Sequence, residues 1–234
     1  MDLIHCGGRA MGDLISKAPF RVTQFTGSSG VAENLAKELH GKIKVEDAGF
    51  DWKILGPDVQ DVDYVAWQCD QDAYACSGQK CSAQSIAFIH ENWMKAGLVE
   101  KMKQTAASRN LKDLSIGPVL SHTTKNMLSH IDRMLEIPGA FVAFGGKELQ
   151  NHTTPEIYGM LEPTAVYVPI TEALKPEHFD AVMTEVFGPF QVLMSFDDSS
   201  LDLVLEACER MSHHLTAAVV SNDVRFRDRV LAHT

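Results

Sequence analysis

The chain has 234 residues, 45% of them hydrophobic, which is enough to bury a core and favours one or two globular domains. Its 31 acidic residues outnumber its 21 basic ones, giving a formal net charge of -10, and no run of Lys or Arg indicates a nucleic-acid partner. No apolar stretch approaches the roughly 18 residues that a membrane-spanning helix needs, and the N-terminus lacks the pattern of a secretory signal. Five cysteines are an odd number, which favours thiols over a framework of disulfides.

The N-terminal part alternates short apolar runs with helical patterns, as α/β architectures do. We expect a strand at residues 2–5, an amphipathic helix at 10–18 and a second strand at 21–25. The Gly/Ser turn TGSSG then leads into a helix in which Val31, Leu35 and Leu39 recur at i, i+4 and i+8. This pattern predicts a turn that joins a strand directly to a helix.

The rest of the chain continues the same alternation, so the sequence predicts an α/β fold with a parallel or mixed sheet. We expect the cysteine-bearing stretch YACSGQKCSAQS to contain a loop between the helix at residues 61–75 and the strand at residues 85–90. The expected strands lie at residues 43–47, 52–56, 85–90, 140–146, 164–170, 190–196 and 216–222, and the expected helices at 61–75, 91–108, 123–135, 201–211 and from about 221 to 234.

Four short motifs occur in one order along the chain: FTGS, Glu46 in KVEDAG, Cys81 in SGQKCSA, and EVFGP. Together they resemble the aldehyde dehydrogenase superfamily, and the 35 residues from Glu46 to Cys81 suit the family pattern. VEDAG departs from the common ELGG form at Asp47 and Ala48. With GQKCSA, this departure is similar to the 1-pyrroline-5-carboxylate dehydrogenase branch, most of all to its plant-type members.

The resemblance covers essentially the whole chain but not the whole family protein. It implies an aldehyde-dehydrogenase-like α/β fold, with residues 1–47 as the C-terminal part of a Rossmann-type, NAD-binding domain. Residues 48–234 would be a catalytic domain truncated at its C-terminal end. The oxyanion asparagine of the family is expected upstream of Met1, and the substrate-anchor loop downstream of Thr234.

The chemistry can be argued from the residues themselves. Hydride transfer from an aldehyde needs a tetrahedral adduct, which a thiolate supplies by adding to the carbonyl, and a thioester then remains. Cys81 lies in a polar, Gly-containing loop after Lys80, where a thiolate can be stabilised. Cys76, near the end of the preceding helix, is more typical of a packing residue. The resemblance implies Cys81 as the nucleophile and Glu46 as the base that activates water for thioester hydrolysis.

For the cofactor, Gly27 and Ser28 come just before a helix N-terminus, where N–H groups and a hydroxyl can meet a pyrophosphate. Taken alone, such a turn is commonly just a helix cap. The family has a glycine where this chain has Ala32. In EVFGP, the resemblance implies that Glu185 hydrogen-bonds the nicotinamide ribose of NAD and that Phe187 packs beside it.

The resemblance implies glutamate γ-semialdehyde, the open form of 1-pyrroline-5-carboxylate, as the small-molecule substrate and glutamate as the product of proline catabolism. Lys80 and Ser82 match positions that contact the substrate carboxylate, and a cation plus a hydroxyl is what such an anion requires. Outside the motif, they would be a surface lysine and a turn serine. The parent enzyme is expected to be mitochondrial and homo-oligomeric, with no nucleic-acid or membrane partner.

Other interpretations remain open for this chain. We expect it to be inactive alone as a dehydrogenase, because parts of the family protein lie outside it. It could instead be a non-catalytic fragment that binds a full-length subunit, or a residual thiol esterase that uses Cys81 and Glu46. A metal site is not expected, since the cysteines and histidines form no CxxC or HxxxH pair.

Overall fold

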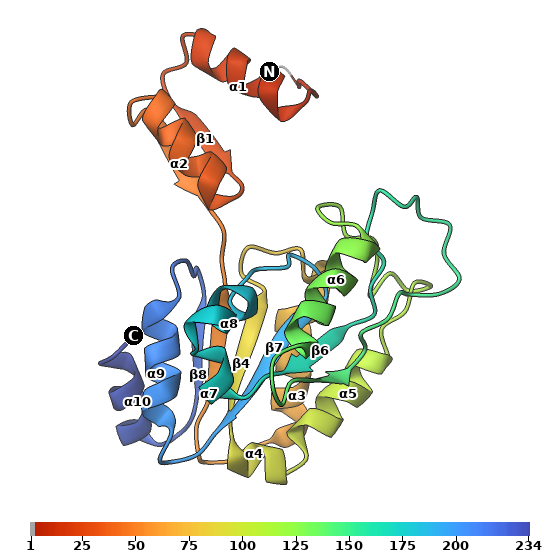
Figure 1. Ribbon diagram of the computed structural model, residues 1–234, viewed down its shortest axis with the longest axis vertical. Coiled ribbons are helices and arrows are strands. Elements are labelled where there is room, and N and C mark those ends of the chain that lie inside the picture. Colours follow the sequence, from red (N-terminus) through yellow and green to blue (C-terminus); the bar gives the residue numbers. More distant parts are fainter. Residues whose placement is uncertain (1–2) are drawn as a thin grey trace. The chain divides into compact units, whose positions relative to one another are not determined.

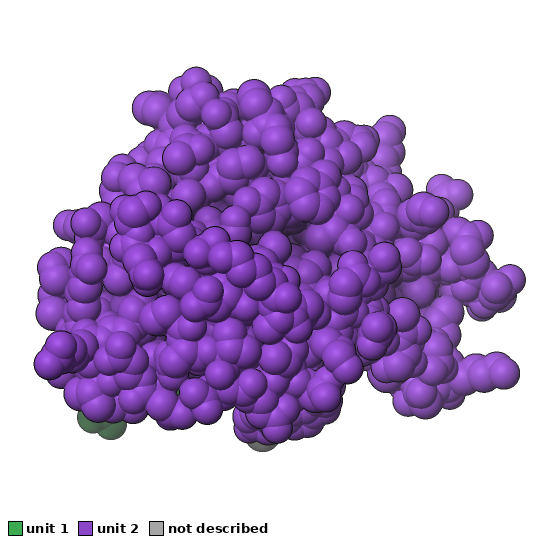
Figure 2. Space-filling model, turned by 90° about the horizontal axis from the view of Figure 1, so that it is seen from below, with its two compact units in different colours: residues 1–48 green, residues 49–234 purple. Residues whose placement is uncertain are grey.

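The computed structural model describes residues 3–234, which form two compact units, one ending at residue 48 and one spanning residues 49–234 (Figures 1 and 2). The boundary lies between Ala48 and Gly49. Each unit has its own sheet and is described by itself. The expected roles of the two parts, cofactor binding and catalysis, remain predictions.

The smaller unit is built around a two-stranded parallel sheet. Strands β1 (Thr23–Thr26) and β2 (Ile43–Glu46) are joined by helix α2 (Ser29–Glu38), and helix α1 (Gly8–Lys17) precedes them. The strand at residues 21–25, the helix after TGSSG and the strand at residues 43–47 were each expected from the sequence, whereas a β-α-β unit was expected over residues 2–25. The strand expected at residues 2–5 is wrong for residues 3–5, which have no regular secondary structure, and Asp2 lies outside the described residues.

The larger unit contains a six-stranded mixed sheet with the strand order β5-β6-β7-β4-β3-β8. All neighbouring strands are parallel except β5 and β6, which are antiparallel. The α/β class expected from the sequence is therefore confirmed. The strands are β3 (Asp51–Leu55), β4 (Gln84–His90), β5 (Phe141–Phe144), β6 (Thr164–Tyr167), β7 (Phe190–Phe196) and β8 (Ala217–Val220).

Helices cover both faces of this sheet (Figure 1). They are α3 (Val62–Tyr74), the 3-10 turn η1 (Ala75–Gly78), α4 (Glu91–Lys95), α5 (Leu98–Ala107), α6 (Thr124–Leu135), α7 (Ile170–Ala173), α8 (Pro176–Val182), α9 (Leu201–Arg210) and α10 (Val224–Leu231). Within residues 3–234, none of the helices is long and apolar enough to cross a membrane.

One expected helix, at residues 91–108, is divided into α4 and α5. The break falls at Gly97, whose φ of 81° lies in the left-handed region that glycine adopts without a steric penalty. Helix α5 then starts with Leu98, which is fully buried. The helical pattern on both sides of Gly97 is local, whereas the change of direction is set by where Leu98 packs.

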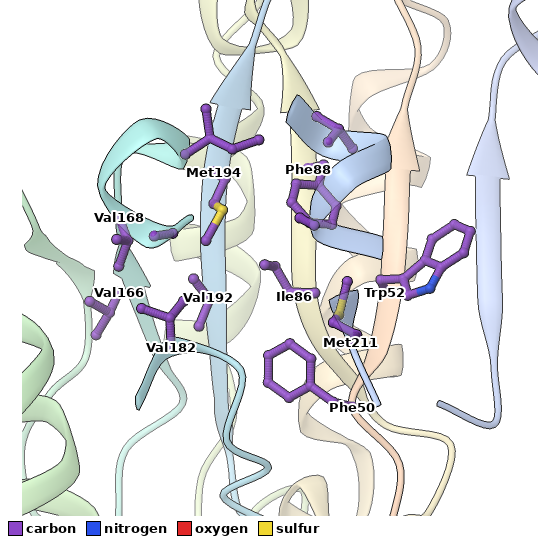
Figure 3. Packing of buried hydrophobic residues seen from close by; sticks show 14 of the residues in the cluster. Phe50, Trp52, Ile86, Phe88, Val166, Val168, Val182, Val192, Met194 and Met211 are labelled. Carbon is purple, nitrogen blue, oxygen red and sulfur yellow. The ribbon is translucent and has the colours of Figure 1, made fainter. Parts of the chain in front are cut away.

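The central strands are buried on both faces because successive side chains of a strand point to opposite sides of the sheet. On β4, Ile86 and Phe88 pack with α6 to α9, whereas Ala87 and Ile89 pack with α3 to α5. Figure 3 shows Ile86 and Phe88 beside Val192 and Met194 of the neighbouring strand β7. Burial of each large apolar side chain contributes about 1.5–3 kcal/mol. The core therefore holds β4 and β7 at fixed positions. The candidate site lies in the loops that lead into the amino ends of these two strands.

Candidate active site

The cysteine motif lies in a loop between α3 and β4. Three consecutive residues of this loop have left-handed backbone angles: Cys76 with φ 56°, Ser77 with φ 57° and Gly78 with φ 69°. Cys81 follows in a turn that is closed by a hydrogen bond from the Ala83 amide to the Lys80 carbonyl, 3.0 Å. A left-handed conformation costs a non-glycine residue roughly 1–2 kcal/mol. The loop therefore keeps this shape only because its surroundings impose it.

Gly78 packs directly against the second motif, EVFGP. A β-carbon at position 78 would overlap the carbonyl group of Gly188, and it would also lie 3.0 Å from the carbonyl oxygen of Ala73. Gly188 itself is buried, two residues before β7, and a β-carbon there would lie 3.0 Å from the Met127 sulfur of α6. Two motifs that lie far apart in the sequence thus meet backbone to backbone, and a glycine is required at the point of contact.

Gly49 connects the nucleophile candidate with Glu185. Its α-carbon packs so closely on the Cys81 backbone that a β-carbon would lie 2.6 Å from the Cys81 carbonyl oxygen. Its backbone amide hydrogen-bonds the Glu185 carboxylate. Cys81 and Glu185 therefore both contact Gly49.

The Glu185 carboxyl group is partly buried, in contrast to an ordinary surface acid. Burial is the main cause that raises its pKa to about 7; the Gly49 amide opposes the rise by stabilising the charged form, and the nearby Asp51 carboxylate adds to it. Glu185 also lines a cavity of about 330 Å³ together with His122, Asn126 and Arg133. Hydrogen-bond donors and a carboxylate that face one cavity suit a ligand that carries hydroxyl groups.

Phe187 lies on the same turn and has a left-handed backbone, with φ 50°. Its side chain, with those of Phe50 and Phe190, lines a narrow cleft into which Gly78 and Glu185 also face. The Ser121 hydroxyl donates to the Phe187 carbonyl oxygen at 3.5 Å. The structure thus brings Phe187, Glu185 and the cysteine loop together in the larger unit.

The five cysteines, all within the described residues, form no disulfide and differ strongly in burial. Burial raises the pKa of the Cys69 thiol above its ordinary value and that of Cys208 to about 12. Cys6 and Cys76 are exposed, and Cys81 is partly exposed. Cys76 is therefore not the packing residue that its place in the sequence suggested, because the left-handed turn directs it outward rather than into the helix interface.

Lys80 and Ser82 flank Cys81 as expected, and the two differ in environment. The Lys80 ammonium donates to the Gln71 carbonyl oxygen, 3.2 Å, near the C-terminal end of α3, where the helix dipole favours a cation. An ammonium has three donors, so this bond leaves capacity for an anion. Ser82 is exposed at the turn.

The smaller unit collects the other three candidate residues at one edge of its sheet. Gly27 and Ser28 follow β1, and Glu46 is the last residue of β2, in register with Thr26. The Gly27 amide donates to the Glu46 carbonyl oxygen at 3.1 Å. Ser28 is the N-cap of α2 but makes no side-chain cap hydrogen bond, so its hydroxyl is not committed to the helix. Glu46 is exposed.

Sequence reasoning missed the residues that hold the cysteine loop. The Ser77 hydroxyl accepts from the Gly117 amide at 2.8 Å and donates to the Gly117 carbonyl oxygen at 3.0 Å. Gln79 accepts from the Leu120 amide at 2.7 Å and donates to the Pro118 carbonyl oxygen at 3.0 Å. The only sequence signal was that Ser and Gln occur beside Gly78, because the partners lie some 40 residues further on.

No group of three or more His, Cys, Asp or Glu side chains that could hold a metal ion occurs within residues 3–234.

The sequence pattern that defines the aldehyde dehydrogenase family matches residues 1–234, so the chain belongs to this family. A mitochondrial delta-1-pyrroline-5-carboxylate dehydrogenase, 12A1 of Arabidopsis thaliana, is 60% identical over 235 residues, which are 100% of this chain and 42% of that protein. A probable aldehyde dehydrogenase of Linum usitatissimum is 58% identical, with the same shares covered. The chain thus spans less than half the length of these curated relatives.

Solved structures of aldehyde dehydrogenases have the same fold. Proline utilization A of Bradyrhizobium japonicum superposes with a TM-score of 0.79 at 25% identity, over 97% of this chain and 23% of that one. An aldehyde dehydrogenase of Bacillus cereus superposes with a TM-score of 0.77 at 22% identity, over 95% of this chain and 44% of that one. The aldehyde-dehydrogenase-like fold expected from the motifs is confirmed.

Proposed function

We propose that the chain is the part of a 1-pyrroline-5-carboxylate dehydrogenase that carries the catalytic thiol, and that it acts in the NAD-dependent oxidation of glutamate γ-semialdehyde to glutamate. The observation that carries this proposal is the packing of the Cys81 loop against EVFGP through Gly78 and Gly49. The 60% identity to the Arabidopsis enzyme over the whole chain supports the choice of substrate.

In this proposal, Cys81 is the nucleophile. As a thiolate, it adds to the aldehyde carbon and forms a thiohemiacetal, from which loss of hydride leaves a thioester on Cys81. NAD, when bound, supplies the hydride acceptor. Glu46 then removes a proton from water, which attacks the thioester and releases glutamate and the Cys81 thiolate.

The residues proposed for the cofactor fit its chemistry. Gly27 and Ser28 lie at the N-terminus of α2, where backbone N–H groups favour a pyrophosphate. Glu185 lines a cavity with hydrogen-bond donors and would accept from ribose hydroxyls, which it does best when ionised. Phe187 would pack beside the nicotinamide.

Lys80 and Ser82 are the proposed contacts for the substrate carboxylate. The Lys80 ammonium is held beside the turn by its bond to the Gln71 carbonyl oxygen, so little conformational entropy would be lost when it meets an anion. This site would select an aldehyde that carries a carboxylate. By analogy with the Arabidopsis relative, we place the enzyme in mitochondria.

The proposal can be tested in a chimera in which this chain replaces the matching part of the Arabidopsis relative. We expect NADH formation with glutamate γ-semialdehyde, abolished by Cys81→Ala and kept by Cys76→Ala. Glu46→Gln should give one equivalent of NADH per active site and then stop, because the thioester accumulates. A chimera that is folded but inactive, or that stays active after Cys81→Ala, would refute the proposal.

Lys80→Met separates substrate recognition from chemistry in the same chimera. We expect the KM for glutamate γ-semialdehyde to rise, while the kcat/KM for propanal, which has no carboxylate, stays within about threefold, since uniform binding energy acts on KM alone. An equal loss with both aldehydes would contradict the role of Lys80 in carboxylate recognition.

A further inference from the structure

The left-handed turn at residues 76–78 is costly in isolation. Cys76 and Ser77 both have side chains that disfavour positive φ, so the turn is disfavoured at two successive residues. Because the cysteine loop follows directly after this turn, any relaxation of the turn changes the path of the chain toward Cys81. Something outside the loop must therefore hold the turn in place.

The Ser77 side chain makes the contact that does this. It is 4% exposed, and its hydroxyl forms a reciprocal pair of hydrogen bonds with the amide and the carbonyl oxygen of Gly117. A β-carbon at Gly117 would meet only the Ser77 hydroxyl, at 3.9 Å. Both polar groups of Gly117 are satisfied by one side chain, so removal of the hydroxyl would leave a partly buried amide and carbonyl without these partners.

Residues 117–120, which include the Gly117 partner of Ser77, are themselves held in place by further hydrogen bonds. Gln79 bonds their backbone at Pro118 and Leu120, and the intervening Val119 forms two backbone hydrogen bonds with Gly159, of 2.7 and 2.8 Å. Val119 is fully buried in the main core cluster. Residues 117–120 thus provide a rigid support, and the loop is attached to it on both sides of Gly78.

The position of Cys81 depends on this attachment. After Gln79, only Lys80 separates the support from Cys81, and the Cys81 carbonyl then lies against Gly49, where a shift toward Gly49 would clash with the backbone. The loop cannot move in that direction, and Ser77 and Gln79 restrain its other end. Small displacements at a reacting group can cost up to about 100-fold in rate, so such restraint matters for chemistry.

We propose that Ser77 is a positioning residue for Cys81: its hydroxyl, bonded to both backbone groups of Gly117, holds the left-handed turn that places the thiol. The inference rests on the proposed role of Cys81 as the nucleophile. Ser77 acts through the backbone and does not touch the reacting atoms. Its loss changes the reactivity of Cys81 more than it changes the fold.

The test measures alkylation of the intact chain by iodoacetamide as a function of pH, with peptide mass spectrometry separating Cys81 from Cys6. Cys6 is exposed in the smaller unit and serves as the internal reference. The variants are Ser77→Ala, which loses the hydroxyl and keeps the backbone cost, and Ser77→Gly, which loses the hydroxyl but adopts positive φ freely. Ser108→Ala, at an exposed hydroxyl that ends α5, is the matched control.

We expect Cys81 of the unsubstituted chain to react at a lower pH than Cys6. Both Ser77 variants should shift the Cys81 midpoint up by about one pH unit, which is about tenfold less thiolate at neutral pH. Cys6 should not change in any variant, and Ser108→Ala should match the unsubstituted chain.

The outcomes separate the two proposals. If Cys81 of the unsubstituted chain reacts at a lower pH than Cys6, and the folded Ser77→Gly variant leaves the pH profile of Cys81 alkylation unchanged, the positioning role is refuted and the nucleophile assignment survives. If Cys81 of the unsubstituted chain titrates like Cys6, both proposals are refuted. If Ser77→Ala merely unfolds, Cys69 and Cys208 become reactive together with Cys81, and the decision then rests on Ser77→Gly, which carries no backbone cost.

Discussion

Gly78 lies with its α-carbon against the carbonyl group of Gly188, so the cysteine loop and the EVFGP turn touch at a point where no side chain fits. The two glycines are separated by more than a hundred residues in the sequence. Their contact also fixes Glu185 and Phe187 relative to the loop, because Gly188 follows these residues directly on the same turn. This backbone contact is therefore one of those on which the geometry of the candidate site in the larger unit depends.

Gly78→Ala should destabilise the larger unit by roughly 2–5 kcal/mol, the sum of a left-handed backbone penalty and a steric overlap. Gly97→Ala is the matched control, because Gly97 also has positive φ but nothing within 4 Å of an added β-carbon. It should cost only about 1–2 kcal/mol. Urea unfolding of both variants measures the difference, and equal losses would show that Gly188 can move away.

The ion pair between Asp70 and Arg109 is buried, with side chains 2% and 7% exposed and 2.6 Å between the closest atoms. Asp70→Ala leaves the guanidinium buried without its carboxylate and should cost about 3–5 kcal/mol in the free energy of unfolding. The exposed pair of Glu91 and Lys95 provides the contrast, and Glu91→Ala should cost at most about 0.5 kcal/mol. Similar effects of the two variants in urea unfolding would contradict the buried-charge argument.

Tyr74 joins three strands through a buried chain of hydrogen bonds. Its hydroxyl accepts from the Gln191 amide at 2.7 Å and donates to the Thr164 carbonyl oxygen at 3.0 Å, and Gln191 accepts from Gln84 at 2.6 Å. Tyr74→Phe keeps the ring but leaves two buried polar groups without these bonds, so we expect a loss of about 1–3 kcal/mol. Unchanged unfolding would indicate that the groups find other partners.

The pH dependence of stability should contain two opposing contributions from one cavity. Burial raises the pKa of Glu185 from 4.5 to about 7, so the folded chain binds a proton that the unfolded chain releases. The contribution of Glu185 to stability is fully present below pH 4.5 and is lost as the pH rises through about 7. Glu185→Gln should therefore remove a fall in the free energy of unfolding between pH 4.5 and about pH 7.

His130 acts in the other direction. Burial lowers its pKa from 6.5 to about 4, and the neighbouring Arg133 and His122 charges add to this effect. Its contribution is present above pH 6.5 and is lost as the pH falls through about 4. His130→Gln should therefore flatten a rise in stability over this range. Guanidinium unfolding at several pH values measures how the free energy of unfolding changes with pH in each variant. If both substitutions changed this slope in the same direction relative to the unsubstituted chain, the assignment would be contradicted.

Much of the fold could be predicted from local patterns. The β-α-β connection of the smaller unit follows from apolar runs on either side of TGSSG. Helix α3 begins where Asp61 caps it by accepting from the Tyr64 amide, 3.0 Å. The strand expected at residues 2–5 is wrong for residues 3–5, because a short apolar run becomes a strand only where another strand pairs with it. The division of residues 91–108 at Gly97 was missed for a similar reason, since packing of Leu98 decides it.

Residues of the candidate site could be predicted from the sequence only where a chemically suitable residue type lies in a short local motif. A cysteine after GQK, a glutamate in EVFGP and a Gly/Ser turn before a helix are local signals, and they identified Cys81, Glu185, Gly27 and Ser28. The role expected for each remains a prediction. The same reasoning took Cys76 for a packing residue, because a helical pattern does not show where the backbone turns left-handed.

By itself, the sequence determined the α/β class and the family and indicated candidate reactive groups, because periodicity and short motifs report on neighbours along the chain. Only the tertiary structure decided which groups are restrained and which have a pKa that burial shifts. Ser77 meets Gly117 and Gly78 meets Gly188 only after the sheet has formed. Likewise, the raised pKa of Glu185 arises from the apolar surroundings and the Asp51 charge that folding brings to it. These properties arise from contacts between residues that are distant in the sequence, and such contacts leave no local pattern.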